Sequence, residues 1–475
     1  MNGGIQMQRT VTAESVTSGH PDKVCDQISD NILDRVLEQD PLARVACEVA
    51  INNRILIIMG EITTTAYVDY ASEAKDVLHK LGYWNILDPH SLANIQIIVS
   101  INEQAPDIAS GVNLMGGIEH HEGLGAGDQG LMIGYACNET KAFMPLPITL
   151  AHALTKRLEE VRREGIIPYL KPDGKAQVSL IYEDDVPIRV ETIVVSAQHK
   201  ESATWKEINK DIYKHVIKAV IPAQMLTKET KILINPTGRF VIGGPEGDSG
   251  LTGRKIIVDT YGGIGRHGGG AFSGKDPSKV DRSGAYMARY IAKNIVAAGL
   301  ATKCEVEMAF AIGQAQPVAL NIHTFGTGLL SDSDFELLIR RTVGLGVSDV
   351  IEKFNLQRPI YSNTAAYGHF GKEDLPWEAT DLVEVLKIKT KNWNKSYEQW
   401  FKALTLEHIK EVHDLELLEY VMVRPGHPEQ YGFLAPGYLM VHDSKASEKI
   451  THLMKRLSEI PNEAVWATIN RRIKQ

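Results

Sequence analysis

A pair of strand-length apolar runs beside a helix-like segment recurs in each third of the chain, and this pattern most restricts the fold. The strand pairs span residues 43–64, 175–199 and 303–326. The helix-like segments span residues 15–40, 205–221 and 332–344. Amphipathic helices bury their apolar stripe against one face of such sheets. The sequence therefore predicts an α+β fold of mostly antiparallel sheets with helices on one face.

Charge and cysteine content exclude several classes of protein. The formal net charge of −8 over 475 residues argues against a general nucleic-acid binder, which needs a basic surface. Cys25, Cys47, Cys137 and Cys304 are far apart, so neither a zinc site nor a disulfide framework is expected. The N-terminus shows no secretory signal, and the apolar runs are too short for a membrane span. We expect a cytoplasmic enzyme that binds neither nucleic acid nor membrane.

The chain changes character after about Lys387. Tryptophan becomes frequent, and two amphipathic helices are predicted at 396–422 and 446–460 with a short hairpin between them. We expect a folded, mainly helical appendage over 388–475. Upstream, the polar and glycine-containing segment 102–122 is typical of a mobile surface loop.

The stretch "GGGAFSGKDPSK" (268–279) imitates the Walker A motif of nucleotide-binding proteins. Gly269 and the pair Gly274–Lys275 fit G-x-x-x-x-G-K, but Asp276 stands where the motif needs a hydroxyl for Mg²⁺. Pro277 cannot lie inside the continuing helix that a Walker A lysine requires. We expect instead a helix that begins after Lys275, with Asp276–Pro277 as its N-cap and first turn.

The same region also imitates the dinucleotide-binding motif. G-x-G-x-x-G occurs at 263–268, after a strand predicted at 254–261. A Rossmann fold needs a second strand about 20 residues later, and a helix-like segment occupies that position. The sequence therefore disfavours this motif as well.

Basic residues surround the glycines. They are Arg254, Lys255, Arg266, Lys275, Lys279 and Arg282, and the interleaved acids are Asp248, Asp276 and Asp281. Exposed backbone N–H groups, a helix N-terminus and cations together bind anions, and carboxylates add Mg²⁺. A polyphosphate–Mg²⁺ site is the favoured interpretation. A solvated basic face is the alternative.

Other polar residues carry weaker signals. His20 and Asp22 stand at a helix start, where they could bind a phosphate and Mg²⁺ or merely cap the helix. Glu48 and Glu61 lie in strand-like segments, where a carboxylate needs a partner. Asp128 is flanked by glycines that let a ligand approach the backbone. Three aspartates at four-residue spacing, which we expect on a solvated helix face, are Asp26, Asp30 and Asp34. No G-x-S-x-G occurs, so a serine hydrolase has no support.

Three segments together closely resemble the S-adenosylmethionine synthetase family. They are "GHPDK" (19–23), "GAGDQG" (125–130) and "GGGAFSGKDPSKVDRS" (268–283). "INPTGRFVIGGPEGD" (234–248) and "TAAYGHFG" (364–371) fit too, and the resemblance covers residues 8–387. It implies three similar α+β domains around a pseudo-threefold axis. The expected boundaries are 8–107, 123–241 and 242–387, followed by the extension 388–475. It also implies a homodimer or homotetramer with active sites between subunits.

The resemblance implies a reaction in which the sulfur of L-methionine attacks C5′ of ATP. The tripolyphosphate that leaves is then hydrolysed to pyrophosphate and phosphate, with Mg²⁺ and K⁺ as cofactors. The implied catalytic residues are His20, Lys175, Arg254, Lys255 and Lys275. The implied ATP-binding residues add Asp173, Arg239, Phe240, Asp248 and Ala271 to these. The implied methionine-binding residues are Glu61, Gln104, Asp128, Asp248, Lys279 and Ile312. The implied metal ligands are Asp22 and Asp281 for Mg²⁺ and Glu48 for K⁺.

The sequence departs from the family pattern in three places. The loop 104–122 is longer than the usual bacterial loop, Ser249 stands where many relatives have cysteine, and 388–475 has no recognised counterpart. Two alternatives therefore stay open. One is another ATP-dependent phosphotransferase or a tripolyphosphatase, which would not consume methionine. The other is a regulatory subunit of a synthetase.

Overall fold

The computed structural model describes residues 8–84, 91–104, 124–403, 433–435 and 438–440, with side chains as far as residue 393. These residues divide into two compact units. The first unit comprises Met1–Ala297, Lys303–Leu320 and Gly344–Thr380, and every candidate site residue lies in it. The second unit comprises Ala298–Thr302, Asn321–Val343 and Asp381–Gln475.

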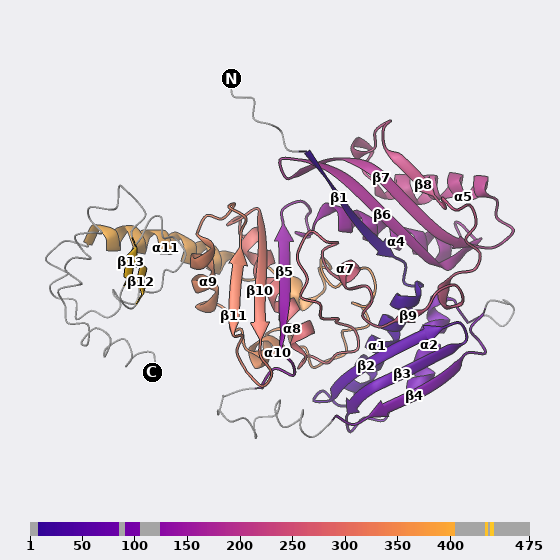
Figure 1. Cartoon of the computed structure of the whole chain (residues 1–475), viewed down its shortest axis with the longest axis horizontal. Helices are drawn as coiled ribbons and strands as arrows, with labels where there is room; N and C mark the ends of the chain where they lie inside the picture. Colours follow the sequence, from indigo (N-terminus) through magenta and orange to yellow (C-terminus); the bar gives the residue numbers. More distant parts are fainter. Residues whose placement is uncertain (1–7, 85–90, 105–123, 404–432, 436–437, 441–475) are drawn as a thin grey trace. The chain divides into compact units, whose positions relative to one another are not determined.

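One sheet of the first unit has the strand order β4-β3-β2-β9, with helices against one face (Figure 1). Its strands are β2 (Arg44–Asn52), β3 (Ile55–Thr63), β4 (Gln96–Asn102) and β9 (Gly250–Leu251). Helices α1 (Pro21–Leu37) and α2 (Tyr70–Leu81) lie on the face where alternate β2 residues are buried. β2 and β3 form the antiparallel hairpin predicted over 43–64, whereas β3 and β4 pair parallel.

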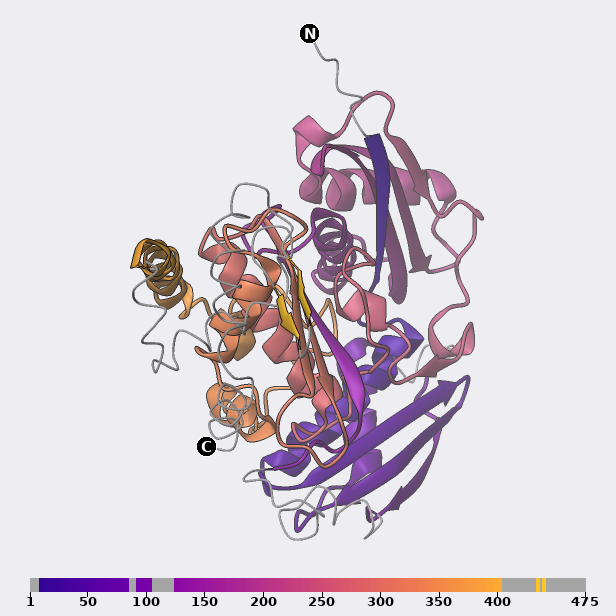
Figure 2. The same cartoon turned by 60° about the vertical axis from the view of Figure 1, so that its left-hand side comes forward.

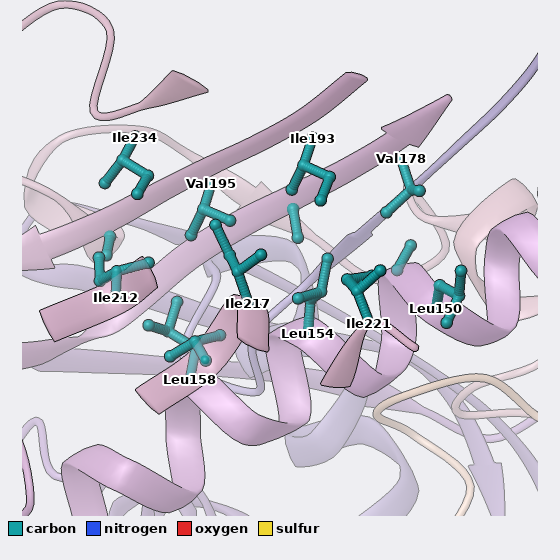
Figure 3. Packing of buried hydrophobic residues seen from close by; sticks show 14 of the residues in the cluster. Leu150, Leu154, Leu158, Val178, Ile193, Val195, Ile212, Ile217, Ile221 and Ile234 are labelled. Atoms are coloured by element: carbon teal, nitrogen blue, oxygen red, sulfur yellow. The ribbon is translucent and has the colours of Figure 1, made fainter. Parts of the chain in front are cut away.

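A second sheet of the first unit has the order β1-β6-β7-β8 (Figure 2). Its strands are β1 (Gln8–Val16), β6 (Leu170–Glu183), β7 (Val186–His199) and β8 (Lys231–Ile234). The helices packed on it are α4 (Leu146–Arg163), α5 (Trp205–Ile212), a π-helical turn at Tyr213–Ile217, and α6 (Lys218–Val220). Leu154 of α4, Ile193 of β7 and Ile217 lie in the shared apolar core (Figure 3).

A third sheet pairs β5 (Gly130–Cys137) antiparallel with β10 (Lys303–Phe310), and α8 (Val280–Ala297) packs on it. Gly134 of β5 permits this packing, because a Cβ atom there would lie 2.0 Å from the carbonyl carbon of Ala288. α10 (Val347–Phe354) follows, with the Phe354 ring edge-on to Tyr290 of α8. β11 (Ala319–His323) runs from this unit into the second.

These sheets combine strands that are remote in sequence. β1 pairs with β6, β5 pairs with β10, and β9 pairs with β2. The predicted α+β class with sheet-plus-helix domains is confirmed, and the pairings are mostly antiparallel as expected. The pseudo-threefold axis and the domain boundaries stay predictions.

The second unit contains α9 (Asp332–Arg340) and α11 (Val383–Ala403). Lys389 of α11 donates to the Arg341 carbonyl at 3.1 Å and to the Thr342 hydroxyl at 3.0 Å. The Arg341 guanidinium lies 5.7 Å from the Trp393 ring centroid. The short hairpin predicted in the appendage is present as β12 (Phe433–Ala435) and β13 (Tyr438–Met440). The helices predicted at 396–422 and 446–460 fall outside the described residues, except for the part of the first that belongs to α11. The loop predicted at 102–122 also falls outside them after residue 104.

Several local predictions around the helices were wrong. The segment predicted as a helix at 15–40 is strand β1 up to Val16, but α1 begins at Pro21, next to His20 and Asp22, which were predicted to stand at a helix start. The strand predicted at 254–261 instead contains one helical turn, α7 (Ile256–Asp259), which ends with Asp259 buried and paired with Lys23. The helix expected after Lys275 begins at Val280, so Asp276 does not cap it.

The three spaced aspartates of α1 are buried, and the predicted solvated face was wrong. Asp26 accepts from Lys23 and from the Gly253 N–H. Asp30 and Asp34 likewise accept bonds from other parts of the chain, namely Arg282, the Gly274 N–H, and the N–H groups of Tyr361 and Ser362. Spacing alone could not predict these partners, because all of them except Lys23 are more than 200 residues away in sequence. Within the part of the chain that the structure describes, no helix is long and apolar enough to cross a membrane.

Candidate active site

His20 caps the N-terminus of α1. Its Nδ1 accepts a hydrogen bond from the Asp22 N–H at 3.2 Å, so the neutral ring carries its proton on Nε2. Burial, with the charges of Lys255 and Lys175, lowers the pKa of His20 to about 3. The turn before it is held by the Tyr83 hydroxyl, which donates to the Gly19 carbonyl. His20 is therefore a neutral, fixed donor at the end of a helix dipole.

Asp22 lies in the first turn of α1 and is close to two cations, Lys255 and Arg254. Its carboxylate accepts from Lys255 at 2.5 Å and from the Leu251 N–H at 3.0 Å, and Arg254 lies 3.6 Å away. These interactions outweigh burial, which alone would raise the pKa of Asp22, and hold that pKa below its usual value. The Arg254 side chain is 48% exposed, so it has room to contact a ligand.

β6 brings Asp173 and Lys175 to the same region. Asp173 accepts from the Gly244 N–H at 2.8 Å through one oxygen. Its other carboxylate oxygen is buried and has no partner among the described residues. Burial raises the pKa of Asp173 to about 6. Lys175 is half exposed and close enough to His20 to lower its pKa.

The glycine-rich loop lies against this surface. Gly253 has φ +78°, and a Cβ atom there would lie 2.6 Å from the side chain of Ala271, so the loop with Arg254 touches the glycine run. Gly270 packs against the Asp281 carboxylate, which a Cβ atom would meet at 2.4 Å. Lys275 donates to Asp281 at 2.6 Å. Two lysine–carboxylate pairs, Lys255–Asp22 and Lys275–Asp281, thus border one glycine-lined surface.

A cavity of about 310 Å³ lies beside the loop, at the end of strands β2, β3 and β4. It contains three of the predicted methionine-binding residues, which are Glu61, Gln104 and Lys279. Arg44, Ala46, Asn102 and Glu103 complete its lining. The sequence analysis missed Arg44. The alternation of β2 could have found it, because Arg44, Ala46 and Glu48 share one strand face.

The other predicted methionine-binding residues are not part of the lining of this cavity. Asp128 is exposed, and its carboxylate accepts from the Gln129 N–H. Ile312, 53% exposed, lies in a loop bonded to the Asp128 loop through Gly313 and Ala126. Asp248 is exposed and accepts from the Ser249 N–H.

The two predicted adenine-side residues lie together in the loop after β8. Arg239 is exposed and pairs with Glu201 at 2.6 Å. The Phe240 N–H donates to His199 Nε2 at 3.1 Å, and its ring lies against Gly243, where a Cβ atom would be 2.6 Å away. The backbone thus fixes Phe240 while leaving its ring partly exposed.

All six basic residues noted in the sequence lie beside a carboxylate, and two of them, Arg282 and Arg266, form more than one bond to carboxylates. Arg282 is buried and forms two bonds to Asp30, at 2.7 and 2.9 Å. Arg266 pairs with Glu305 at 2.6 Å and with Glu307 at 3.0 Å. These arginines therefore bind the chain to itself, whereas Lys255 and Lys275 border the site.

The carboxylates fit Mg²⁺ only in combination with a ligand. No group of three or more potential metal-binding side chains occurs among the described residues. Mg²⁺ in phosphate sites typically takes one or two carboxylates and completes its shell with phosphates and water. Asp22 and Asp281, each now paired with a lysine, match that requirement. Glu48 is partly buried, and burial raises its pKa, so a nearby cation would stabilise its ionised form.

Comparison with known proteins agrees with this geometry. The chain matches three family models in order, and they are described as the N-terminal domain (8–106), the central domain (123–240) and the C-terminal domain (242–379) of S-adenosylmethionine synthetase. A curated relative, the S-adenosylmethionine synthase of Clostridium tetani (strain Massachusetts / E88), is 53% identical over 388 residues. The alignment covers 80% of this chain and 99% of that protein. The chain therefore belongs to the S-adenosylmethionine synthetase family.

Proposed function

We propose that this chain is a methionine adenosyltransferase, which forms S-adenosylmethionine from L-methionine and ATP and releases pyrophosphate and phosphate. Its membership of the family supports this reaction. The observation that carries the proposal is the pairing of Lys255 with Asp22 and of Lys275 with Asp281 at one glycine-lined surface. Such a surface suits a polyphosphate bound together with divalent cations.

The reaction explains why the site needs cations rather than a general base. A lone pair of the methionine sulfur forms the S–C5′ bond, and the C5′–O bond breaks with its electrons moving onto tripolyphosphate. The sulfur has no proton to lose, so the first step needs no general base. The developing charge is on the leaving group, where fixed donors give the greatest stabilisation. His20 Nε2–H, Lys175, Arg254, Lys255 and Lys275 would provide these donors.

Asp22 and Asp281 would hold Mg²⁺, and Glu48 would hold K⁺. Bound Mg²⁺ would neutralise phosphate charge and favour departure of the tripolyphosphate. In that state Lys255 and Lys275 would exchange their carboxylate partners for phosphate oxygens. Their present bonds keep them near the places where those oxygens would lie.

The adenine end of ATP would lie against the ring of Phe240. Arg239, Asp248 and Ala271 would contact the rest of the nucleotide. The buried and unpaired oxygen of Asp173 would accept a bond from it, since such an oxygen is costly to leave without a donor.

We also propose that the chain acts as a homo-oligomer, a dimer or a tetramer, in the cytoplasm. The sheet face opposite α1 and α2 exposes apolar residues, among them Ile55, Met59, Ile98 and Leu251. An exposed apolar sheet face of this kind favours association with a second copy. A second copy would also bring its Asp128 and Ile312 to the cavity that contains Glu61.

One incubation tests the reaction. Purified protein is mixed with ATP, L-methionine, Mg²⁺ and K⁺, and the products are resolved by mass spectrometry. We expect S-adenosylmethionine with equimolar pyrophosphate and phosphate. Untouched methionine with hydrolysed ATP would instead indicate a phosphotransferase or tripolyphosphatase. Omitting Mg²⁺ or K⁺ in turn tests each cofactor.

A further inference from the structure

The turn that leads into His20 is held at every polar group of Ser18. The Ser18 hydroxyl donates to Glu159 of α4 at 2.5 Å, and the Ser18 N–H donates to the Tyr367 hydroxyl at 3.2 Å. The Ser18 carbonyl accepts a bond from the Gln27 side chain at 2.7 Å. The backbone that carries the His20 ring is therefore positioned by side chains from outside the turn.

Two of these contacts meet at the carboxylate of Glu159, which is buried. One of its oxygens accepts both from Ser18 and from the Tyr367 hydroxyl, and the other accepts from Arg163 at 2.5 Å. Burial alone would raise the pKa of Glu159, but these bonds and the charge of Arg163 hold that pKa below its usual value. Burial, with the charge of Glu159, raises the pKa of Tyr367, so the tyrosine keeps its proton and acts as the donor.

Tyr367 has a backbone conformation that is costly for a tyrosine. Its φ is +61°, in the left-handed region that favours glycine. Strain of this kind persists only where the surrounding contacts impose it, and it is frequent at functional sites. In this conformation the Tyr367 hydroxyl bridges the Ser18 N–H and the Glu159 carboxylate. The strained residue therefore belongs to the same set of contacts that fixes the turn before His20.

We propose that Glu159 is a positioning residue, which acts through Ser18 and Tyr367 to fix the turn that aims the His20 Nε2–H at the leaving phosphate. The inference rests on the proposed function, in which that N–H stabilises the leaving group. Glu159 lies on α4, which packs against β6, whereas His20 caps α1, which packs against β2. A hydrogen bond to a developing charge depends on exact placement, so a small shift of the turn lowers the rate. The family resemblance assigned no role to Glu159.

A double-mutant cycle tests whether Glu159 acts through His20. In the wild-type background, Glu159→Ala should lower kcat for S-adenosylmethionine formation about 10- to 50-fold and change KM for ATP about threefold or less. In the His20→Ala background, the same change should lower kcat about twofold or less, because the donor that Glu159 positions is absent. Glu159→Gln keeps an oxygen that can accept from Ser18, and its kcat should stay within about fivefold of wild type. Equal losses in both backgrounds would overturn the proposal.

A matched control removes the next carboxylate of the same helix. Glu160 pairs with Arg157 at 3.2 Å, and Glu160→Ala should keep the wild-type kcat. Hydrogen–deuterium exchange followed by mass spectrometry provides a measurement that needs no turnover. Exchange in a peptide that contains residues 18–22 should be about tenfold faster in Glu159→Ala and unchanged in Glu160→Ala. Unchanged exchange in Glu159→Ala would also overturn the proposal. If the wild-type chain forms no S-adenosylmethionine, the proposed reaction fails, and the exchange result alone decides whether Glu159 holds this turn.

Discussion

The glycine-rich surface and the buried core of the first unit both contain pairs of a basic residue and a carboxylate, but these pairs differ in how many of their hydrogen bonds are formed within the protein. In the core, the fully buried Arg289 forms two bonds to Glu378 and three to backbone carbonyls. Lys293 adds a bond to the same carboxylate at 2.7 Å. At the surface, the Lys275 ammonium bonds to Asp281 and to no other side chain among the described residues, and each side chain of that pair is about one-fifth exposed (21% and 20%).

The number of hydrogen-bond donors that are still unbonded distinguishes a structural ion pair from a functional one. A guanidinium whose N–H donors are all bonded within the protein cannot bind a ligand unless some of those buried bonds break. A lysine with one bonded carboxylate retains donors that a phosphate can take. Satisfied networks therefore mark the scaffold, and partly satisfied pairs mark the site.

The largest effect is expected from breaking a structural pair. Arg282→Met removes the partner of buried Asp30 and the donors to the Phe272 and Lys275 carbonyls. We expect a loss of about 3–5 kcal/mol in the free energy of unfolding, because an unpaired charge stays buried. Urea denaturation monitored by circular dichroism measures this.

The control replaces both members of that pair. Arg282→Met combined with Asp30→Leu removes the buried charge together with its partner and should recover part of the lost stability. A single variant that unfolds at the wild-type urea concentration would contradict the view that this pair is structural.

A site pair should behave in the opposite way. Lys275→Met removes one cation from the glycine-rich surface, where the loop backbone is held by other contacts. We expect kcat for S-adenosylmethionine formation to fall about 10²- to 10³-fold with the unfolding midpoint nearly unchanged. Steady-state kinetics and thermal melting of the same preparation test both halves. Near-normal turnover would remove Lys275 from the site.

The sequence predicted the fold class, whereas the roles of the site residues stay predictions. The motif residues Asp22, Lys255 and Lys275 are recognisable one by one, and in the structure each of the two lysines pairs with a carboxylate predicted to bind Mg²⁺. Helix and strand periodicity likewise predicted the β2–β3 hairpin, since each side of it repeats locally.

Partners remote in sequence could not be predicted. The pattern of α1 gives no means of knowing that Asp30 meets Arg282, which is 252 residues away. The same reason explains the error at 254–261, where the inward turn of Asp259 depends on Lys23. Arg44 was missed because a single arginine at the end of a strand belongs to no sequence motif. Its position in the cavity lining is visible only in the structure.

The pH dependence of stability tests the environment of a buried histidine, His152. Burial, with the charges of Lys372 and Lys23, lowers the pKa of His152 to about 3. Below about pH 6.5 the unfolded chain binds a proton there that the folded chain does not bind until about pH 3, so stability falls as pH falls through this interval. The contribution is at most about 1.4 kcal/mol per pH unit.

The variant His152→Gln isolates that contribution. Glutamine does not titrate and can still bond to the Ser15 hydroxyl, which lies 2.8 Å from His152 Nδ1. Unfolding free energies measured between pH 4 and 7, at about one-unit intervals, should show a shallower slope in the variant. Equal slopes would mean that His152 accepts its proton in the folded chain.

The smallest effect on turnover is expected at Arg266, an arginine close in sequence to the glycines whose side chain pairs with carboxylates of β10. Arg266 is 56% exposed and pairs with Glu305 and Glu307. Arg266→Met should cost about 1–3 kcal/mol of stability, less than Arg282→Met, because the buried Glu305 carboxylate loses the guanidinium but keeps its bond from the Arg266 N–H. Its kcat should stay within about twofold of wild type, since no phosphate cation is lost. Steady-state kinetics of Arg266→Met and Lys275→Met, measured in parallel, test this prediction. A loss of activity like that of Lys275→Met, with stability unchanged, would mean that a well-paired arginine can still contact the substrate. The number of unbonded donors would then no longer distinguish structural pairs from site pairs.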